Sequence, residues 1–152
     1  MNYWDRKVIR EQLDEKLKVL KSFVGVLPQQ GWVKTIREVL GMSASQLGKK
    51  VGIDQSRISR LENAEKAGDL KLSSLQKIAK GLDMEFVYGF VPKDTLETMM
   101  INQARSLALK RFKTLNATMS LENQSLSENE KKKALEDMIQ KILIENPKEL
   151  WG

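Results

Sequence analysis

The chain has 152 residues, of which 41% are hydrophobic and 30% are charged, so it can hold one ordinary core with appended helices but not two large domains. It contains no cysteine and no histidine, which excludes disulfides, zinc-thiolate sites and the Ser-His and Cys-His nucleophile pairs. The net charge is +6, and residues 31–82 alone carry ten Lys or Arg against five Asp or Glu. This local basic excess is typical of a protein that binds a polyanion, with a merely soluble basic surface as the alternative.

The residue inventory also argues against an enzyme. Without His and Cys, catalysis would depend on carboxylates, lysines or bound magnesium, and no Gly-rich phosphate loop or close Asp cluster is present to hold such a metal. We therefore expect no catalytic residue, no metal and no cofactor. No apolar run approaches the roughly 18 residues that a membrane span needs, so we expect a soluble, cytoplasmic protein without a membrane partner.

Residues 1–30 are predicted to form an N-terminal helical extension. A helix over residues 5–21 has one apolar stripe, formed by Ile9, Leu13, Leu17 and Leu20. The Leu-Pro-Gln-Gln-Gly stretch at 27–31 breaks this helix. A second helix is expected to begin at Trp32 and to end at Gly41.

The central feature is a pair of short helices over residues 42–62. Ser43 is placed to cap the first helix, with a Gln three residues later to complete a capping box, and Asp54 is placed to cap the second. Only Gly52 and Ile53 lie between the two helices. The turn is therefore tight and the helices must cross steeply, which is the geometry of a helix-turn-helix.

The second of these helices, expected to end near Asn63, has two distinct faces. Steps of 100° per residue from the apolar Ile58 place Leu61 and Glu62 inward. The same steps place Ser56 and Arg60 directly outward, with Arg57 and Ser59 beside them and Gln55 in the exposed first turn. Their mixture of donors, acceptors and cations suits reading of the major groove, and a plain solvent face is the alternative. The candidate base-reading residues are Gln55, Ser56, Arg57, Ser59 and Arg60. The candidate phosphate contacts are Ser43, Gln46, Lys49 and Lys71.

Arg37 and Glu62 are both predicted to point inward. Arg37 shares the helical stripe of Val33 and Leu40, and an inward charge is costly unless it is paired. We therefore predict a structural ion pair between Arg37 and Glu62, and prefer it to a contact of either residue with DNA.

A strand is predicted after the next helix. A polar stretch from Ala64 to Lys71 leads to a helix over residues 72–82. Met84–Val91 is rich in aromatic and β-branched residues and is predicted to be a strand. One strand cannot satisfy its own edges, so its partner is either Ser22–Leu27 or the same strand of a second subunit.

Residues 93–152 are predicted to form a C-terminal helical region for dimerisation or partner binding. A long helix follows Pro92, and Ser127 with Glu130 forms a capping box for a last helix. The unpaired strand and the Met-rich helix after Pro92 favour a homodimer.

The residues of the central segment resemble the Xre, or lambda-repressor-like, helix-turn-helix family over residues 32–90. The resemblance rests on Arg37, Gly41-Met42-Ser43, the turn Gly52-Ile53-Asp54, and Ile58-Ser59-Arg60-Leu61-Glu62. That family often has Gln directly after the capping Ser, where this chain has Ala44, so Gln46 is the candidate for the phosphate contact made there.

Segments along nearly the whole chain resemble the group called mobile mystery protein A. They are 12–17, 31–37, 82–88, 118–124 and the closing Leu150-Trp151. Members of that group are typically encoded beside a Fic-domain protein, so the resemblance implies an antitoxin or autoregulatory role. Thr118–Asn123 also fits the Ser/Thr-x-x-x-Glu-Gly/Asn pattern of Fic inhibitory helices, although an ordinary helix end is the favoured interpretation.

The sequence thus predicts an all-α, lambda-repressor-like helix-turn-helix domain with one short β-strand and helical extensions at both ends. The expected divisions are 1–30, 31–92 and 93–152. We expect a homodimeric repressor that binds a pseudo-palindromic double-stranded DNA operator and regulates an operon shared with a Fic-domain toxin. The alternatives are an antitoxin whose main role is to bind that partner and, with no polar constellation to support it, a repressor that responds to a small molecule.

Overall fold

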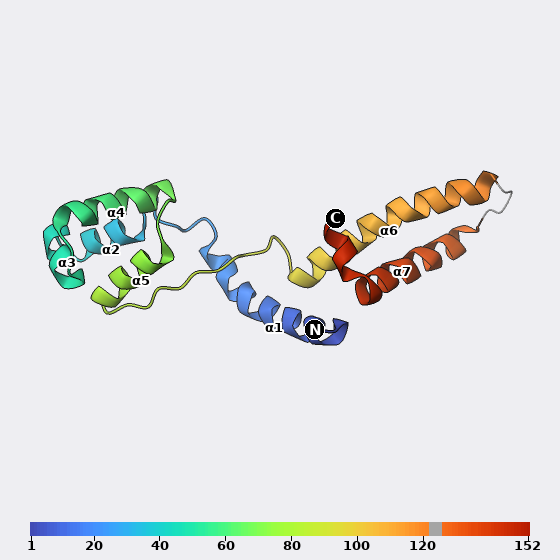
Figure 1. Cartoon of the computed structure of the whole chain (residues 1–152), viewed down its shortest axis with the longest axis horizontal. Helices are drawn as coiled ribbons and strands as arrows, with labels where there is room; N and C mark the ends of the chain where they lie inside the picture. The colour runs from blue at the N-terminus through green and yellow to red at the C-terminus, as the bar shows by residue number, and fades with distance from the viewer. Residues whose placement is uncertain (122–125) are drawn as a thin grey trace. The chain divides into compact units, whose positions relative to one another are not determined.

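The computed structural model describes residues 1–121 and 126–152 of the chain, and these form helices joined by turns and loops (Figure 1). The elements are α1 (Tyr3–Leu20), the 3-10 helix η1 (Lys21–Phe23), α2 (Trp32–Val39), α3 (Ala44–Val51), α4 (Gln55–Ala67), α5 (Leu72–Gly81), α6 (Leu96–Leu121), α7 (Glu128–Glu145) and the 3-10 helix η2 (Pro147–Trp151). The predicted all-α class is confirmed. None of the described helices is long and apolar enough to cross a membrane.

The helices belong to two compact units. Leu20–Phe90 contains α2 to α5, whereas Met1–Val19 and Val91–Gly152 together contain most of α1 with α6, α7 and η2. The N-terminal helix therefore shares a unit with helices that follow it by more than seventy residues in the sequence.

The unit at Leu20–Phe90 has a small core to which each of its four α-helices contributes. The buried residues are Val33 of α2, Leu47 of α3, Ile58 of α4 and Ile78 of α5. Leu47 and Ile58 are completely inaccessible to solvent. Since these two belong to the two short helices flanking the turn, the core fixes how those helices cross.

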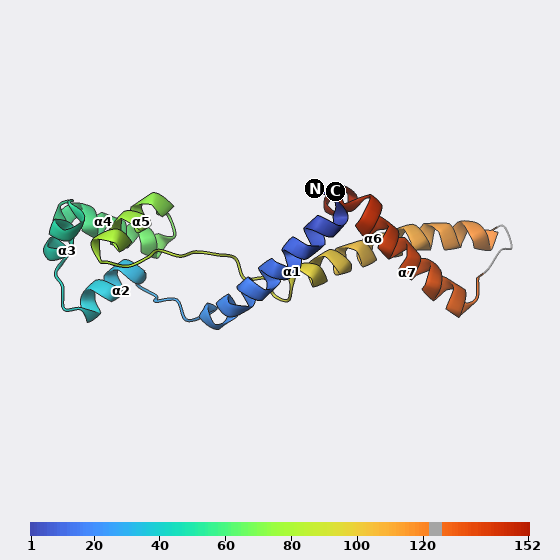
Figure 2. The ribbon, with the colours of Figure 1, turned by 90° about the horizontal axis from the view of Figure 1, so that it is seen from below.

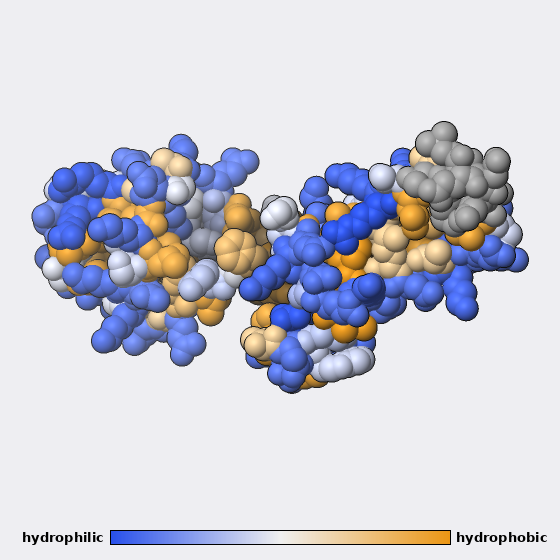
Figure 3. All heavy atoms as spheres, turned by 45° about the vertical axis from the view of Figure 1, so that its right-hand side comes forward, coloured by the Kyte–Doolittle hydropathy of each residue, from blue (hydrophilic) through white to orange (hydrophobic). Residues whose placement is uncertain are grey.

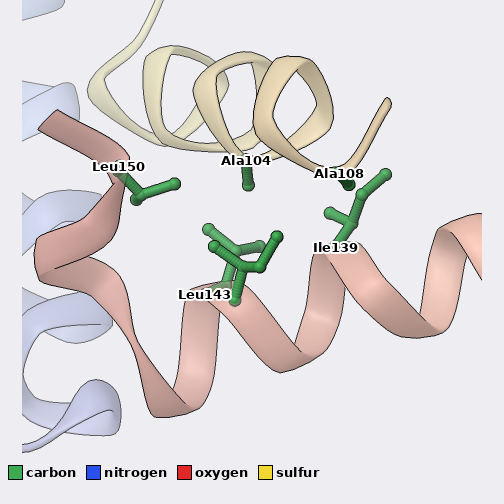
Figure 4. Packing of buried hydrophobic residues seen from close by; sticks show 6 residues of the cluster. Ala104, Ala108, Ile139, Leu143 and Leu150 are labelled. Carbon is green, nitrogen blue, oxygen red and sulfur yellow. The ribbon is translucent and has the colours of Figure 1, made fainter. Parts of the chain in front are cut away.

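The other unit is built on a hairpin of α6 and α7, which lie side by side in both views of the ribbon (Figures 1 and 2). Ala104 and Ala108 of α6 face the larger Ile139 and Leu143 of α7, and Leu150 of η2 closes the end of this core (Figure 4). Alanine has only a methyl side chain, so it allows the two helices to approach closely.

Polar contacts attach α1 to the start of α6. The Asp14 carboxylate accepts hydrogen bonds from the backbone N–H groups of Leu96 (2.7 Å) and Glu97 (3.2 Å), so it caps a helix eighty residues away in the sequence. Arg10 Nε lies 2.7 Å from Glu97 Oε2. These contacts explain how α1, which has no buried residue, is held in its unit.

The predicted strand at Met84–Val91 is wrong for the single chain. In the described residues this segment is neither helix nor strand, and part of its expected partner, Ser22–Leu27, belongs to η1. The N–H groups of Val24 and Val26 donate to carbonyls three residues earlier, which keeps that partner segment in turns. The β-prone side chains are present, but a strand also needs a second backbone within hydrogen-bonding distance.

The prediction that α4 ends near Asn63 is also wrong, because the helix continues to Ala67. Residues 64–67 are Ala-Glu-Lys-Ala, which are strong helix formers despite their polarity. Gly68, with a φ of 75°, ends the helix in the left-handed conformation.

The longer α4 carries Glu65, whose role was not predicted from the sequence. Glu65 accepts hydrogen bonds from the backbone N–H groups of Trp32 (2.7 Å) and Val33 (3.0 Å) at the start of α2. The N-cap residue of α2 is Gly31, which has no side chain to do this. A carboxylate from α4 therefore replaces the missing cap and holds the two helices together.

We expect Glu65→Ala to destabilise the Leu20–Phe90 unit by about 1 kcal/mol, because two N–H groups lose their acceptor. Thermal unfolding followed by circular dichroism measures this. Lys66→Ala is the matched control, since Lys66 is the exposed neighbour on the same helix. Equal melting temperatures for the two variants would contradict the capping role.

Candidate nucleic-acid interface

The first helix of the pair, α3, begins with the predicted capping box. The Ser43 hydroxyl oxygen accepts from the Gln46 N–H (3.1 Å), and the Gln46 side-chain oxygen accepts from the Ser43 N–H (2.7 Å). At the other end Gly52 has a φ of 82°, and its N–H donates to the Gly48 carbonyl at 2.8 Å. The left-handed Gly52 is what turns the chain sharply toward the second helix.

Gly48 is a second glycine with a role, which was not predicted from the sequence. A Cβ atom there would lie 2.5 Å from the carbonyl oxygen of Ile53, so only glycine allows this approach. The Ile53 N–H also donates to the Gly48 carbonyl at 2.9 Å. The turn is therefore packed directly onto the middle of α3, which holds α4 at a fixed angle. A glycine within a predicted helix was the signal that could have revealed it.

The second helix, α4, begins at the predicted cap. Asp54 Oδ1 accepts from the Arg57 N–H (2.8 Å) and from the Ser56 hydroxyl (2.6 Å). The bond from Ser56, followed by the bond from the Arg57 N–H, lowers the pKa of Asp54. A carboxyl whose pKa is lower in the folded state stabilises that state above its unfolded pKa, and this contribution is lost as the pH falls through the folded pKa. The cap is therefore charged at neutral pH.

The structure places all five candidate base-reading residues on the exposed side of α4. Ile58 is completely buried and Glu62 is only 7% exposed, whereas the residues around Ile58 are open to solvent. The exposed set is Gln55, Ser56, Arg57, Ser59 and Arg60. Within it, the Ser56 hydroxyl donates to Asp54, so in the free protein it presents only acceptor lone pairs.

The candidate phosphate contacts are also exposed, and they lie on α3 with its cap and just before α5. Lys49 lies on α3, Lys71 precedes α5, and Ser43 and Gln46 form the capping box. In that box the hydroxyl and the side-chain amide both act as acceptors through oxygen. The Ser43 O–H and the Gln46 NH2 group therefore stay available as donors, which is what a phosphate oxygen requires.

The exposed cations of this surface form no ion pair with the described residues, and Arg57 and Arg60 interact with the Asp54 carboxylate at longer range. Lys49, Arg57, Arg60 and Lys71 have no carboxylate oxygen within 4.0 Å among the described residues. Their charge is therefore available to a polyanion.

Arg37 and Glu62 form an ion pair between α2 and α4. Arg37 Nε lies 2.6 Å from Glu62 Oε1 and Nη2 lies 3.1 Å from Oε2, while Nη1 donates to the Met42 carbonyl at 2.9 Å. The two side chains are 13% and 8% exposed. The hydrogen bond to Glu62 raises the pKa of Arg37, so the arginine is charged at any pH at which the protein is folded.

Comparison with known proteins agrees with this geometry. Residues 33–88 match the family model described as "Helix-turn-helix". The match includes all of α3, the turn and α4. No curated protein and no solved structure was found to match the chain. Residues 33–88 thus form a helix-turn-helix domain of the Xre, or lambda-repressor-like, type, which is a DNA-binding regulatory domain.

Substitutions at Arg60 and Glu62, two residues apart on α4, should have different effects because Arg60 is exposed and Glu62 is buried. Arg60→Ala removes an exposed cation, so we expect DNA binding to weaken by about 1 to 3 kcal/mol with little change in melting temperature. Glu62→Ala leaves the charge of Arg37 buried without a partner, so we expect the free energy of unfolding to fall by about 3 to 5 kcal/mol. Duplex binding by fluorescence anisotropy and thermal unfolding measure the two effects.

The double variant Arg37→Met with Glu62→Leu provides the control. It strands neither charge, so much of the stability lost in Glu62→Ala should return. Recovery should be incomplete, because the Met42 carbonyl still loses its donor. If Glu62→Ala melted normally but no longer bound DNA, the assignment of the two faces would be wrong.

Proposed function

We propose that this chain is a sequence-specific transcriptional repressor that binds its operator as a homodimer. The observation that carries the proposal is the exposed polar face of α4, held by a buried Ile58 and capped at its start by Asp54. Donors, acceptors and cations on one short helix are the groups that read base edges in the major groove.

The positions of the exposed residues favour a division of roles along the domain. Residues at the start of α4, Gln55, Ser56, Arg57, Ser59 and Arg60, are proposed to face the base edges. Residues on the flanking elements are proposed to contact phosphates and so set the register. Those residues are Ser43, Gln46, Lys49 and Lys71.

Two copies are proposed to bind a pseudo-palindromic operator. A dimer places two recognition helices on half-sites about one helical turn apart, roughly 34 Å, and this spacing makes the operator symmetric. The regulated operon is proposed to be the one that encodes this chain and a Fic-type partner, as the resemblance to mobile mystery protein A implies.

A second candidate function is that of an antitoxin that inhibits such a partner. It is favoured by the unit containing α6 and α7, which has its own core and takes no part in the proposed DNA contacts. The Thr118–Asn123 pattern that resembles Fic inhibitory helices lies outside the residues whose side chains the structure describes, so it contributes nothing to this argument.

The repressor proposal predicts tight, salt-sensitive binding to duplex DNA from the chain's own promoter region. If Lys49 and Lys71 each neutralise one phosphate, as proposed above, the slope of log K against log salt should be about −1.8 per subunit, at about −0.9 for each phosphate neutralised. Titrations at several salt concentrations measure this. A shuffled duplex of equal length is the control, and equal affinity for both duplexes at physiological salt would contradict the proposal.

The antitoxin candidate is tested by separating the two activities in the full chain. Arg57→Ala with Arg60→Ala should abolish operator binding but leave inhibition of the co-expressed neighbouring gene product intact, because α4 belongs to the other unit. Cell growth and co-purification report inhibition. Loss of inhibition in this variant, with normal melting, would place the partner's binding surface on α4 and reject the proposed division.

A further inference from the structure

The segment that follows α5 carries a run of exposed aromatic and aliphatic side chains. Residues 84–90 read Met-Glu-Phe-Val-Tyr-Gly-Phe, with one charged residue in seven. Val87 is 78% exposed, Tyr88 67% and Phe90 86%. Apolar side chains lie at the surface of this unit among polar ones (Figure 3). Segments that join compact units are usually polar, so this composition is not that of a simple spacer.

The backbone of the same segment is unpaired. Met84 N–H donates to the Ala79 carbonyl at 2.8 Å, and no backbone group from Glu85 to Phe90 forms a hydrogen bond with the described part of the chain. The rings of Phe86 and Tyr88 are stacked, with centroids 5.9 Å apart. Residues two apart therefore share a face, as in a strand. A β-prone run with open N–H and C=O groups is a template for pairing with another chain.

We propose that residues 84–90 pair with the same residues of a second copy of this chain, as a two-stranded antiparallel sheet centred on Val87. A two-fold axis through the sheet at Val87 keeps the same residues of both copies on the same face. Phe86 then lies opposite Tyr88 of the partner subunit, and Met84 opposite Phe90 of the partner subunit. Cross-strand pairs that contain an aromatic ring are among the stabilising ones in antiparallel sheets.

The charges and the ends of the segment favour this register. Glu85, the one charged residue, lies opposite Gly89 of the partner subunit, so like charges do not meet. Asp83 has a φ of 58°, which ends an extended run on one side. Pro92, which has no N–H, ends the ladder on the other. A second copy is therefore the occupant that this sequence complements.

This pairing deepens the proposed function, because it would join two recognition helices into one symmetric reader. It is nevertheless testable without DNA. The chain has no native cysteine, so a single introduced cysteine can form a disulfide only with the same cysteine of a second copy. Val39 offers a matched control, since it is also 78% exposed and lies in the same unit.

The first measurement compares disulfide formation by Val87→Cys and Val39→Cys in the full chain. Opposite residues of an antiparallel ladder have Cα atoms about 4.5 to 5.5 Å apart, within the range of a disulfide. At about 10 µM protein, Val87→Cys should form the linked dimer on the order of a hundred times faster than Val39→Cys, because a millimolar effective concentration replaces the bulk one. Non-reducing gels measure the rates, and equal rates would overturn the proposal.

The second measurement compares Val87→Lys with Val39→Lys by light scattering. A lysine at the two-fold axis would lie directly opposite the same lysine of the second copy, and the two positive charges would repel each other. Val87→Lys should therefore behave as a 17.4 kDa monomer, while Val39→Lys stays dimeric. Circular dichroism checks that both variants keep their helices. A dimer that survives in Val87→Lys would overturn this surface. If that Val87→Lys dimer bound the operator selectively, the proposed repressor function would still hold. If instead the cross-linked Val87→Cys dimer bound all duplexes equally, the repressor function would be wrong and the proposed interface would be right.

Discussion

The ion pair between Arg37 and Glu62 is the constraint on which the helix-turn-helix geometry depends. Arg37 donates to both oxygens of Glu62 and to the carbonyl of Met42, so one side chain joins α2, α4 and the residue before the cap of α3. A bidentate guanidinium fixes the orientation of its carboxylate as well as the distance. Because Glu62 cannot turn away without stranding a buried charge, the rotation of α4 about its own axis is fixed.

That rotation decides which residues of α4 face solvent. Ile58 and Glu62 are one helical turn apart and both are buried, so they mark the inward face. The residues between and before them therefore lie on the opposite face of the helix and point toward solvent. Gly48 adds the second restriction, since its contact with the Ile53 carbonyl sets the angle at which α4 leaves the turn. The proposed reading surface is therefore held by groups that do not themselves contact DNA.

Much of this unit could be predicted from its sequence because the signals are local. Caps such as Ser43 and Asp54, the turn at Gly52 and the apolar period around Ile58 act within four residues, and helix geometry converts them directly into faces. The features that could not be predicted depend on distant partners. Glu65 caps a helix more than thirty residues away, and Asp14 caps one eighty residues away. The prediction of a strand was wrong for the same reason, because a strand forms only beside a second backbone and the sequence does not identify that partner.

Residues 31–82 include five acidic residues and still present a cationic face, because the scaffold binds several of their carboxylates. Glu62 is bound to Arg37, Glu65 to the start of α2, and Asp54 to the start of α4. Each of these carboxylates is oriented by N–H donors of the scaffold, so its field is largely compensated where it arises. The cations of α3 and α4 have no such partner within 4.0 Å among the described residues. The same contacts that hold the helices together therefore leave the positive charge concentrated on the outward face, where a phosphate backbone would meet it.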